Sequence, residues 1–273
     1  MRIPFMKMSG SGNDFILIDH RKPFFDRNRM KRFAQKVCRR KVSVGADGII
    51  FIERSKKADF KWQFFNADGS EAEMCGNGGR CAARFAHLKR VAGPHLTFET
   101  LAGILSAEVD GKRVKLEMTK PYGLHLDEKI SVEGRRLTIS RINTGVPHAI
   151  VFLDSVKGTD VAGIGRAIRN HPHYAPKGTN ANFVQVRNRS RLLVRTYERG
   201  VEDETLACGT GAVASALIAA FKGLVKSPVS VKTSGGEILT VHFEIEGREV
   251  RKVFFEGDVH IIYEGELWEE AYE

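Results

Sequence analysis

Two cysteines stand in nearly the same local sequence, half a chain apart. One begins the run Cys75-Gly76-Asn77-Gly78-Gly79-Arg80, and the other begins Cys208-Gly209-Thr210-Gly211-Ala212. Each follows a polar, acid-containing stretch and precedes small and apolar residues that predict a buried helix. A cysteine at a helix N-terminus has its thiolate stabilised by unpaired backbone N–H groups and by the helix dipole, which can bring the thiol pKa from about 8.5 down to about 3.5–7.5. Both cysteines are therefore candidates for acid–base chemistry.

A matched pair of thiols suits the inversion of a carbon centre. One thiolate removes the α-proton of an amino acid, and the opposite thiol delivers a proton to the other face. The α-carbon is a very weak acid, so the charge that develops on the carboxylate must be stabilised, and two helix N-termini supply that stabilisation. The glycines after each cysteine let a ligand approach the backbone closely. The scheme requires no cofactor, and we find no motif for a pyridoxal phosphate site.

The offset between the cysteines, 208 − 75 = 133 residues, recurs along the chain. Gly45-Ala46-Asp47 corresponds to Gly178-Thr179-Asn180, and Gly103 corresponds to Gly236, at the same offset. The recurrence indicates an internal duplication with one thiol in each copy. We therefore expect two domains related by a pseudo-twofold axis.

Short stretches rich in β-branched and aromatic residues dominate the sequence, with hairpin signals such as Asp110-Gly111 between them. Helical patterns cover 29–39, 78–88, 160–169 and 212–221, and the last of these is apolar almost all round, so it should be enclosed on every side. We predict an α+β fold of two pseudosymmetric domains, each a curled, mainly antiparallel sheet around a central helix. The expected bounds are 1–118 with 264–273 for the first domain and 119–263 for the second, with a crossing near residues 120–123.

Composition restricts the class of protein. The 273 residues carry a formal charge of +10, with 42% hydrophobic residues, and no apolar run is long enough for a membrane span. The N-terminus shows no signal-peptide pattern. The four cysteines form no Cys-x-x-Cys pair and no cluster with histidines. We expect a cytoplasmic protein with reduced thiols, no metal and no membrane partner.

Three other functions fit the sequence less well. A nucleic-acid partner is not expected, because the Lys and Arg residues are scattered and no zinc-finger, RRM or KH signature occurs. The run from Gly10 to Phe15 begins like a dinucleotide fingerprint, but Phe15 replaces its third glycine. A cysteine protease could pair a thiol with His148, yet two matched cysteines would then be unexplained.

From Lys7 to about Gly265 the sequence resembles diaminopimelate epimerase, a cofactor-independent isomerase. The motifs that carry the resemblance are Gly10-Ser11-Gly12-Asn13-Asp14-Phe15, Asn66-Ala67-Asp68-Gly69-Ser70, Met74-Cys75-Gly76-Asn77-Gly78, Pro147-His148, Gly178-Thr179-Asn180, Tyr197-Glu198-Arg199-Gly200 and Ala207-Cys208-Gly209-Thr210-Gly211. The resemblance implies interconversion of LL- and meso-diaminopimelate in lysine and peptidoglycan precursor biosynthesis. It also implies two pseudosymmetric domains with the site in the cleft between them, and a homodimer.

The same resemblance implies roles for individual residues. Cys75 and Cys208 would be the acid/base pair, and His148 with Glu198 would be an auxiliary acid/base pair. The reacting carboxylate would bind to backbone groups of four residues that follow the cysteines: Gly76, Asn77, Gly209 and Thr210. The amino groups and the distal carboxylate would bind to five polar side chains: Asn13, Asn66, Asn180, Glu198 and Arg199.

Two departures from the family pattern affect substrate contacts. Val146 stands where many members have an asparagine, and Asp47-Gly48 lacks an amide that some members place there. Both changes concern affinity more than the thiol chemistry. A proline racemase-like enzyme on the same fold is the nearest alternative. Such enzymes tend to carry histidine at the position of Asn77 and to lack the Glu198-Arg199 pair, which favours a substrate with a charged far end.

Overall fold

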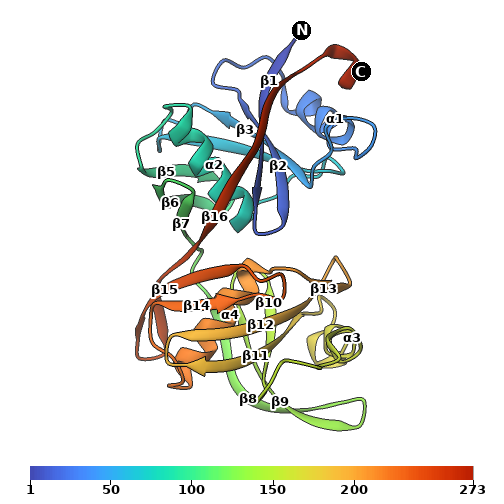
Figure 1. The fold of residues 1–273 in the computed structure, drawn as a ribbon, viewed down its shortest axis with the longest axis vertical. Helices are drawn as coiled ribbons and strands as arrows, with labels where there is room; N and C mark the ends of the chain where they lie inside the picture. Colours follow the sequence, from blue (N-terminus) through green and yellow to red (C-terminus); the bar gives the residue numbers. More distant parts are fainter. Residues whose placement is uncertain (273) are drawn as a thin grey trace. The chain divides into compact units, whose positions relative to one another are not determined.

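The computed structural model describes residues 1–272, which form two compact units (Figure 1). The first unit contains residues 1–117 together with those from Gly257 onward, and the second contains residues 118–256. The chain therefore passes between the units twice, after Glu117 and after Glu256. The domain bounds expected from the sequence, 1–118 with 264–273 and 119–263, remain a prediction.

The first unit is a sheet that closes on itself. Its strands follow the order β1-β2-β3-β4-β5-β6-β7-β16, and β1 also pairs with β16. The pairs β2–β3 and β4–β5 are parallel, and the other pairs with a known register are antiparallel. The elements are β1 Ile3–Gly10, β2 Asn13–Asp19, α1 Arg27–Val37, β3 Gly48–Glu53, β4 Phe60–Asn66, α2 Gly76–Leu88, β5 His95–Thr100, β6 Gly103–Asp110, β7 Arg113–Glu117, the end of β16 Glu249–Leu267, and the short helix η2 Glu269–Ala271.

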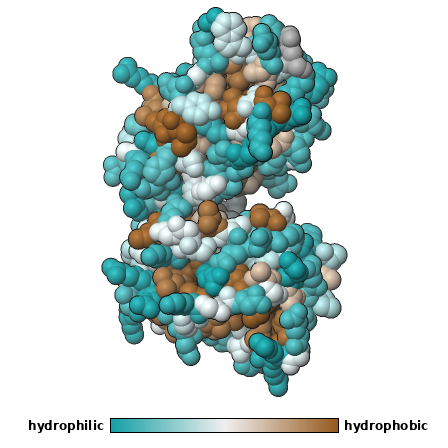
Figure 2. Space-filling model, turned by 45° about the vertical axis from the view of Figure 1, so that its right-hand side comes forward, coloured by the Kyte–Doolittle hydropathy of each residue, from teal (hydrophilic) through white to brown (hydrophobic). Residues whose placement is uncertain are grey.

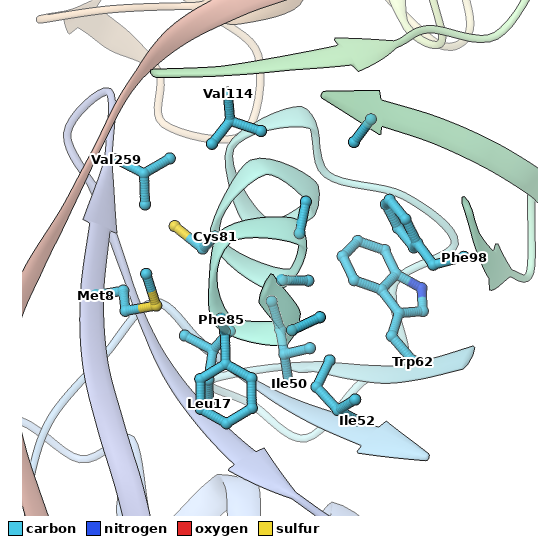
Figure 3. Close-up of a cluster of buried hydrophobic side chains, with 14 of the residues drawn as sticks. Met8, Leu17, Ile50, Ile52, Trp62, Cys81, Phe85, Phe98, Val114 and Val259 are labelled. Atoms are coloured by element: carbon cyan, nitrogen blue, oxygen red, sulfur yellow. The ribbon is translucent and has the colours of Figure 1, made fainter. Parts of the chain in front are cut away.

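Helix α2 fills the inside of this closed sheet. Figure 3 shows apolar side chains of several strands directed at α2. Met8 of β1, Trp62 of β4 and Val259 of β16 belong to one buried cluster with Cys81 and Phe85 of the helix. Most residues of α2 are buried against these strands, although Arg80, Arg84 and His87 interrupt its apolar surface.

Helix α1 covers the other face of the same sheet. Asp26 caps its N-terminus by accepting a hydrogen bond from the Arg29 backbone N–H at 2.8 Å. Its buried residues Met30, Phe33 and Val37 pack in a cluster with residues of β2, β3 and β4. The spacing of these residues is the one from which the sequence predicted a helix at this place.

The second unit repeats the plan around α4. Its strands follow the order β8-β9-β10-β11-β12-β14-β15-β16, with β13 beside β12, and β10–β11 and β12–β14 are parallel. Residues Gly211–Ala219 of α4 are all buried, which agrees with the enclosure predicted for 212–221 except at Ala220 and Phe221, which are half-buried. The elements are β8 Tyr122–Val132, β9 Arg135–Asn143, β10 Pro147–Phe152, α3 Val161–Arg169, the short helix η1 Pro172–Tyr174, β11 Asn180–Asn188, β12 Arg191–Glu198, β13 Asp203–Thr205, α4 Gly209–Phe221, β14 Val229–Lys232, β15 Ile238–Glu246 and the beginning of β16.

The predicted α+β fold and its duplication are confirmed. The bounds of α2, 76–88, and of α4, 209–221, differ by 133 at both ends (209 − 76 and 221 − 88). Both helices begin earlier than the sequence predicted, directly after the cysteines. The residues between each cysteine and the predicted helix, 76–77 and 209–211, belong to the first helical turn in the structure, so the predicted position of both cysteines at a helix start is correct.

Three strands were not predicted. They are β1, which begins at Ile3, β8, which begins at Tyr122 within the expected crossing at 120–123, and the short β13, Asp203–Thr205. The exposed surface is mostly hydrophilic on the face drawn in Figure 2, with apolar side chains gathered in separate patches. Among the described residues, no helix is long and apolar enough to cross a membrane.

Candidate active-site residues at the starts of two helices

Cys75 is the N-cap residue of α2. Its Sγ accepts a hydrogen bond from the Gly78 backbone N–H at 3.5 Å, and the side chain is half-buried. The N–H groups of the first helical turn have no partners within the helix, so they face the same region as the thiol. This arrangement stabilises an anion at the helix start, whether it is the thiolate itself or a bound carboxylate.

A directed chain of hydrogen bonds surrounds this helix start. Arg80 can only donate, and its Nη2 lies 2.8 Å from Asn77 Oδ1. The Asn77 amide nitrogen must therefore face the other way, and it donates to Asn13 Oδ1 at 2.8 Å. Asn13 in turn donates through Nδ2 to Asp47 Oδ2 at 3.0 Å. The structure thus brings Asn13 and Asn77 together and fixes the orientation of both amides.

Two ion pairs of Asp14 anchor the strand that carries Asn13. Asp14 accepts from Arg40 at 2.6 Å and pairs with Lys7 Nζ at 2.8 Å, and Lys7 is itself buried. Burial alone would raise the pKa of Asp14, but the hydrogen bonds and charges of Arg40 and Lys7 outweigh it and lower the pKa to about 2. Asp14 is therefore ionised at neutral pH.

Asn66 stands apart from this chain of hydrogen bonds in the structure. It ends β4, and its amide donates to Ser70 Oγ at 3.0 Å within the following turn. Its backbone pairs with Gly48 on β3, which in turn pairs with Phe15 on β2. The backbone therefore places Asn66 two strands away from the region of Asn13, with its side chain turned toward Ser70.

Cys208 is the N-cap residue of α4, but its environment differs from that of Cys75. The residue is 7% exposed, and its Sγ lies 3.6 Å from Thr210 Oγ1 without capping the helix. Burial and the nearby Glu198 raise the pKa of the Cys208 thiol to about 12. A helix start can lower the pKa of a thiol, but for Cys208 desolvation outweighs that effect.

Glu198 lies next to the Cys208 thiol. Burial raises the pKa of its carboxyl group, while hydrogen bonds from Thr205 and from the Cys208 thiol partly offset that rise. Thr205 Oγ1 donates to Glu198 Oε2 at 3.0 Å, and Thr144 Oγ1 donates to the Thr210 backbone oxygen at 3.0 Å. These contacts fix the residues around the start of α4.

Asn180 and Arg199 are also held together. Asn180 Oδ1 accepts from the Arg199 backbone N–H at 2.7 Å, and its amide nitrogen donates to the Pro147 oxygen at 3.3 Å. The Arg199 guanidinium donates through Nη1 to the Lys177 oxygen at 3.0 Å. A guanidinium has about five N–H donors, so others are left for a carboxylate.

His148 is completely buried on β10. Burial, with the nearby charge of Arg199, lowers the pKa of His148 to about 3, so the ring is neutral. Its Nδ1 lies 3.1 Å from Asn182 Nδ2, whereas its Nε2 has no hydrogen-bond partner among the described residues. The auxiliary acid/base role of His148 with Glu198 remains a prediction.

Several residues that position these groups were not predicted from the sequence. Arg80 is fully buried in α2, and the signal available was its position among the small and apolar residues at the start of the helix. Asp47 and Asn182 act through contacts between strands that no local pattern shows. No group of three or more His, Cys, Asp or Glu among residues 1–272 is arranged to hold a metal ion.

The comparison that decides the family covers both halves of the chain. The family model for diaminopimelate epimerase matches residues 5–123 and residues 140–261. The chain belongs to the diaminopimelate epimerase family. The two matched stretches fall one in each half, as expected for a duplicated chain.

Relatives with this name occur in bacteria and archaea. The diaminopimelate epimerase of Aquifex aeolicus (strain VF5) is 47% identical over 280 residues, covering 98% of this chain and 99% of that protein. The diaminopimelate epimerase of Archaeoglobus fulgidus is 48% identical over 249 residues, covering 86% of this chain and 88% of that protein. Both alignments span nearly the full length of this member of the family.

Solved structures with low sequence identity share the fold. A phenazine biosynthesis protein of the PhzF family from Bacillus anthracis matches with a TM-score of 0.72 at 16% identity, covering 98% of this chain and 99% of that chain. A hydroxyproline epimerase from Agrobacterium vitis matches with a TM-score of 0.68 at 15% identity, covering 97% of this chain and 92% of that chain. These similarities confirm the predicted fold class.

Proposed function

We propose that this member of the diaminopimelate epimerase family interconverts LL- and meso-diaminopimelate without a cofactor, in lysine and peptidoglycan precursor biosynthesis. The observation that carries the proposal is the placement of Cys75 and Cys208 as N-cap residues of α2 and α4, in a chain that belongs to this family over both halves. One thiol from each unit acts on opposite faces of the same α-carbon.

The different environments of the two thiols support different protonation states for Cys75 and Cys208. Cys208 is protonated at neutral pH because burial and Glu198 raise its pKa to about 12. Cys75 accepts a hydrogen bond at the start of α2, which suits a thiolate. In the first turnover, the Cys75 thiolate removes the α-proton of the isomer whose α-proton faces Cys75. The Cys208 thiol donates its proton to the opposite face of the same α-carbon. After this step Cys75 is a thiol and Cys208 is a thiolate, which is the protonation that the reverse reaction requires.

The helix starts stabilise the reacting carboxylate in this proposal. The backbone N–H groups of Gly76, Asn77, Gly209 and Thr210 belong to the first turns of α2 and α4, where they have no partners within a helix. Negative charge that moves onto the carboxylate in the transition state therefore meets preorganised donors.

Polar side chains in each unit bind the other groups of the substrate. Arg199 offers a bidentate guanidinium to the distal carboxylate. Glu198 accepts from an ammonium group. The neutral amides of Asn13, Asn66 and Asn180 complete the recognition of a substrate that is charged at both ends.

Isotope exchange tests the substrate class and the chemistry together. Purified protein is incubated in deuterated water with LL-diaminopimelate or with L-proline, without pyridoxal phosphate. We expect α-deuterium in diaminopimelate and formation of the meso isomer. Deuterium in proline alone would replace this assignment with that of a proline racemase.

We also propose that the protein is a cytoplasmic homodimer. The described cysteines Cys38, Cys75, Cys81 and Cys208 are all free, which fits a reducing compartment. On β16, Ile261, Ile262 and Tyr263 are consecutive apolar residues that are 41%, 53% and 43% exposed, and a second copy would cover them. Light scattering after size-exclusion chromatography tests this proposal, and a monomeric mass at micromolar concentration would reject it.

A further inference from the structure

Asn182 lies at the centre of a buried polar cluster that the proposed mechanism does not use. It is fully buried on β11, and its amide nitrogen donates to the Ala149 oxygen and lies 3.1 Å from His148 Nδ1. Its Oδ1 accepts from Thr196 Oγ1 at 2.9 Å. Three of the hydrogen bonds that an asparagine side chain can make are thus formed within the second unit.

The same side chain supports the start of α4. A Cβ atom added at Gly211 would lie 2.4 Å from Asn182 Oδ1 and 3.2 Å from Cys208 Sγ. Gly211 therefore lies next to both the Asn182 side chain and the candidate catalytic thiol of Cys208. Asn182 is close to the chemistry but has no direct contact with a reacting group.

The neighbours of Asn182 determine which way its amide points. The Ala149 backbone oxygen can only accept, so the Asn182 nitrogen must face it. The other N–H of that nitrogen is then directed at His148 Nδ1, which must accept. A neutral imidazole that accepts at Nδ1 carries its proton on Nε2.

The Nε2 atom of His148 therefore carries an N–H group with no partner among the described residues. An unpaired buried donor is unfavourable, and such groups are commonly retained where a ligand satisfies them. Register places His148 opposite Asn180 on the neighbouring strand, and Asn180 belongs to the proposed substrate contacts. A ligand oxygen, such as that of a carboxylate, is the acceptor that this donor fits.

We propose that Asn182 is a positioning residue that holds His148 as the neutral tautomer protonated at Nε2, so that His148 offers a buried N–H donor to the substrate. The tautomer follows from the contacts of Asn182 alone, whereas its catalytic consequence rests on the proposed epimerase function. Within the predicted auxiliary acid/base pair, His148 then acts as a donor through Nε2–H, because Asn182 occupies the lone pair of Nδ1.

The tautomer is measured by long-range ¹H–¹⁵N NMR of the full-length protein labelled at histidine, with His148 assigned from the spectrum of H148Q. At neutral pH we expect a protonated Nε2 and an unprotonated Nδ1. In N182D the carboxylate accepts from Nδ1–H, so the proton moves to Nδ1 or the ring becomes cationic. A wild-type ring protonated at Nδ1, or a folded N182D with an unchanged tautomer, overturns the proposal.

A matched control makes the same chemical change elsewhere in the unit. Asn143 on β9 donates to Tyr122 Oη at 2.9 Å and has no contact with His148. N143D should therefore leave the His148 signals as they are in the wild type. If N182D does not fold, N182S replaces it, because one hydroxyl cannot donate to both Ala149 and His148 and should give a mixture of tautomers. A wild-type tautomer in folded N182S counts against the proposal.

Kinetics show whether the tautomer matters to the reaction. We expect N182D to lower kcat for diaminopimelate by about 10-fold to 100-fold, as for other changes that misorient a functional histidine, while N143D changes it little. An unchanged kcat in N182D with a switched tautomer would reject the catalytic consequence. If the wild type does not act on diaminopimelate at all, the proposed function fails, and the NMR result still tests the tautomer.

Discussion

Cys75 and Cys208 are the N-cap residues of α2 and α4, whereas Cys38 and Cys81 are not at a helix start, and this difference in position predicts which cysteines matter. Cys38 and Cys81 are buried in apolar clusters, where burial raises the pKa of each thiol to about 12. We expect Cys75→Ala and Cys208→Ala each to lower the epimerisation rate by at least about 100-fold, the weight of a positioned acid or base. The rate is measured as conversion of each isomer into the other. Cys38→Ala serves as the control and should keep normal turnover per folded molecule, and normal turnover in Cys75→Ala or Cys208→Ala would contradict the two-thiol scheme.

Acid stability is a second property set by single residues. The pKa of Asp14 is lowered to about 2, because Arg40 and Lys7 outweigh burial, and the pKa of Glu53 is lowered to about 2 by His20 and Lys61 against burial. Both values lie below those of the unfolded chain, so the native state binds fewer protons than the unfolded state. The stability from these carboxylates is present above about pH 5 and is lost as the pH falls toward 2.

The size of this effect is roughly 1–2 kcal/mol for each carboxyl group in the free energy of unfolding. Urea unfolding at pH values from 7 to about 3 measures it. Asp14→Asn should be less stable at neutral pH and should show a shallower dependence on pH, whereas Asp154→Asn, at an exposed carboxyl group, should follow the wild type. An unchanged slope in Asp14→Asn would show that Asp14 does not contribute this stability.

Helices α2 and α4 occupy equivalent places, yet their third residues tolerate different side chains. Gly78 and Gly211 are related by the offset of 133 (211 − 78). A Cβ at Gly211 would lie 2.4 Å from Asn182 Oδ1, whereas a Cβ at Gly78 would lie 3.3 Å from its nearest neighbour, the flexible end of Ile50. We expect Gly211→Ala to destabilise the protein by about 1–3 kcal/mol through overpacking and to lower activity, because α4 must shift at Cys208.

Gly78→Ala is the matched control for this change. It adds the same methyl group at the corresponding position of α2 and should cost less than 1 kcal/mol, since alanine also has the higher helix propensity, by about 0.8–1.0 kcal/mol. Thermal unfolding of both variants gives the comparison. Equal destabilisation by the two substitutions would mean that the close approach to Asn182 does not limit the residue at 211.

At the scale of the whole molecule, the sequence predicts what is repeated and misses what depends on distant chain segments. The offset of 133 and the apolar pattern of 212–221 were sufficient to predict two copies of a sheet around a helix. Strand β1 was missed because Pro4 and Lys7 interrupt its pattern, and it is stabilised by pairing with β16 from the other end of the chain. The same limit applies to the site: the cysteine motifs were evident, but the positioning contacts of Arg80 and Asn182 exist only after the strands pair.

The first unit therefore depends on the last residues of the chain to close its sheet. Ile3 pairs with Leu267, and Leu267 is 3% exposed within the cluster that also contains Phe33. We expect Leu267→Ala to lower the free energy of unfolding by about 2–5 kcal/mol, through lost apolar burial and a cavity between β16 and α1. Urea unfolding measures the change, with the fluorescence of Trp62, which is buried in the first unit, as the probe. Trp268 is replaced by Phe in every protein compared, so that only Trp62 contributes to the signal. Leu101→Ala removes an equal side chain that is 58% exposed and should have little effect. Similar losses from the two substitutions would show that the C-terminal end of β16 is not needed to hold the closed sheet together.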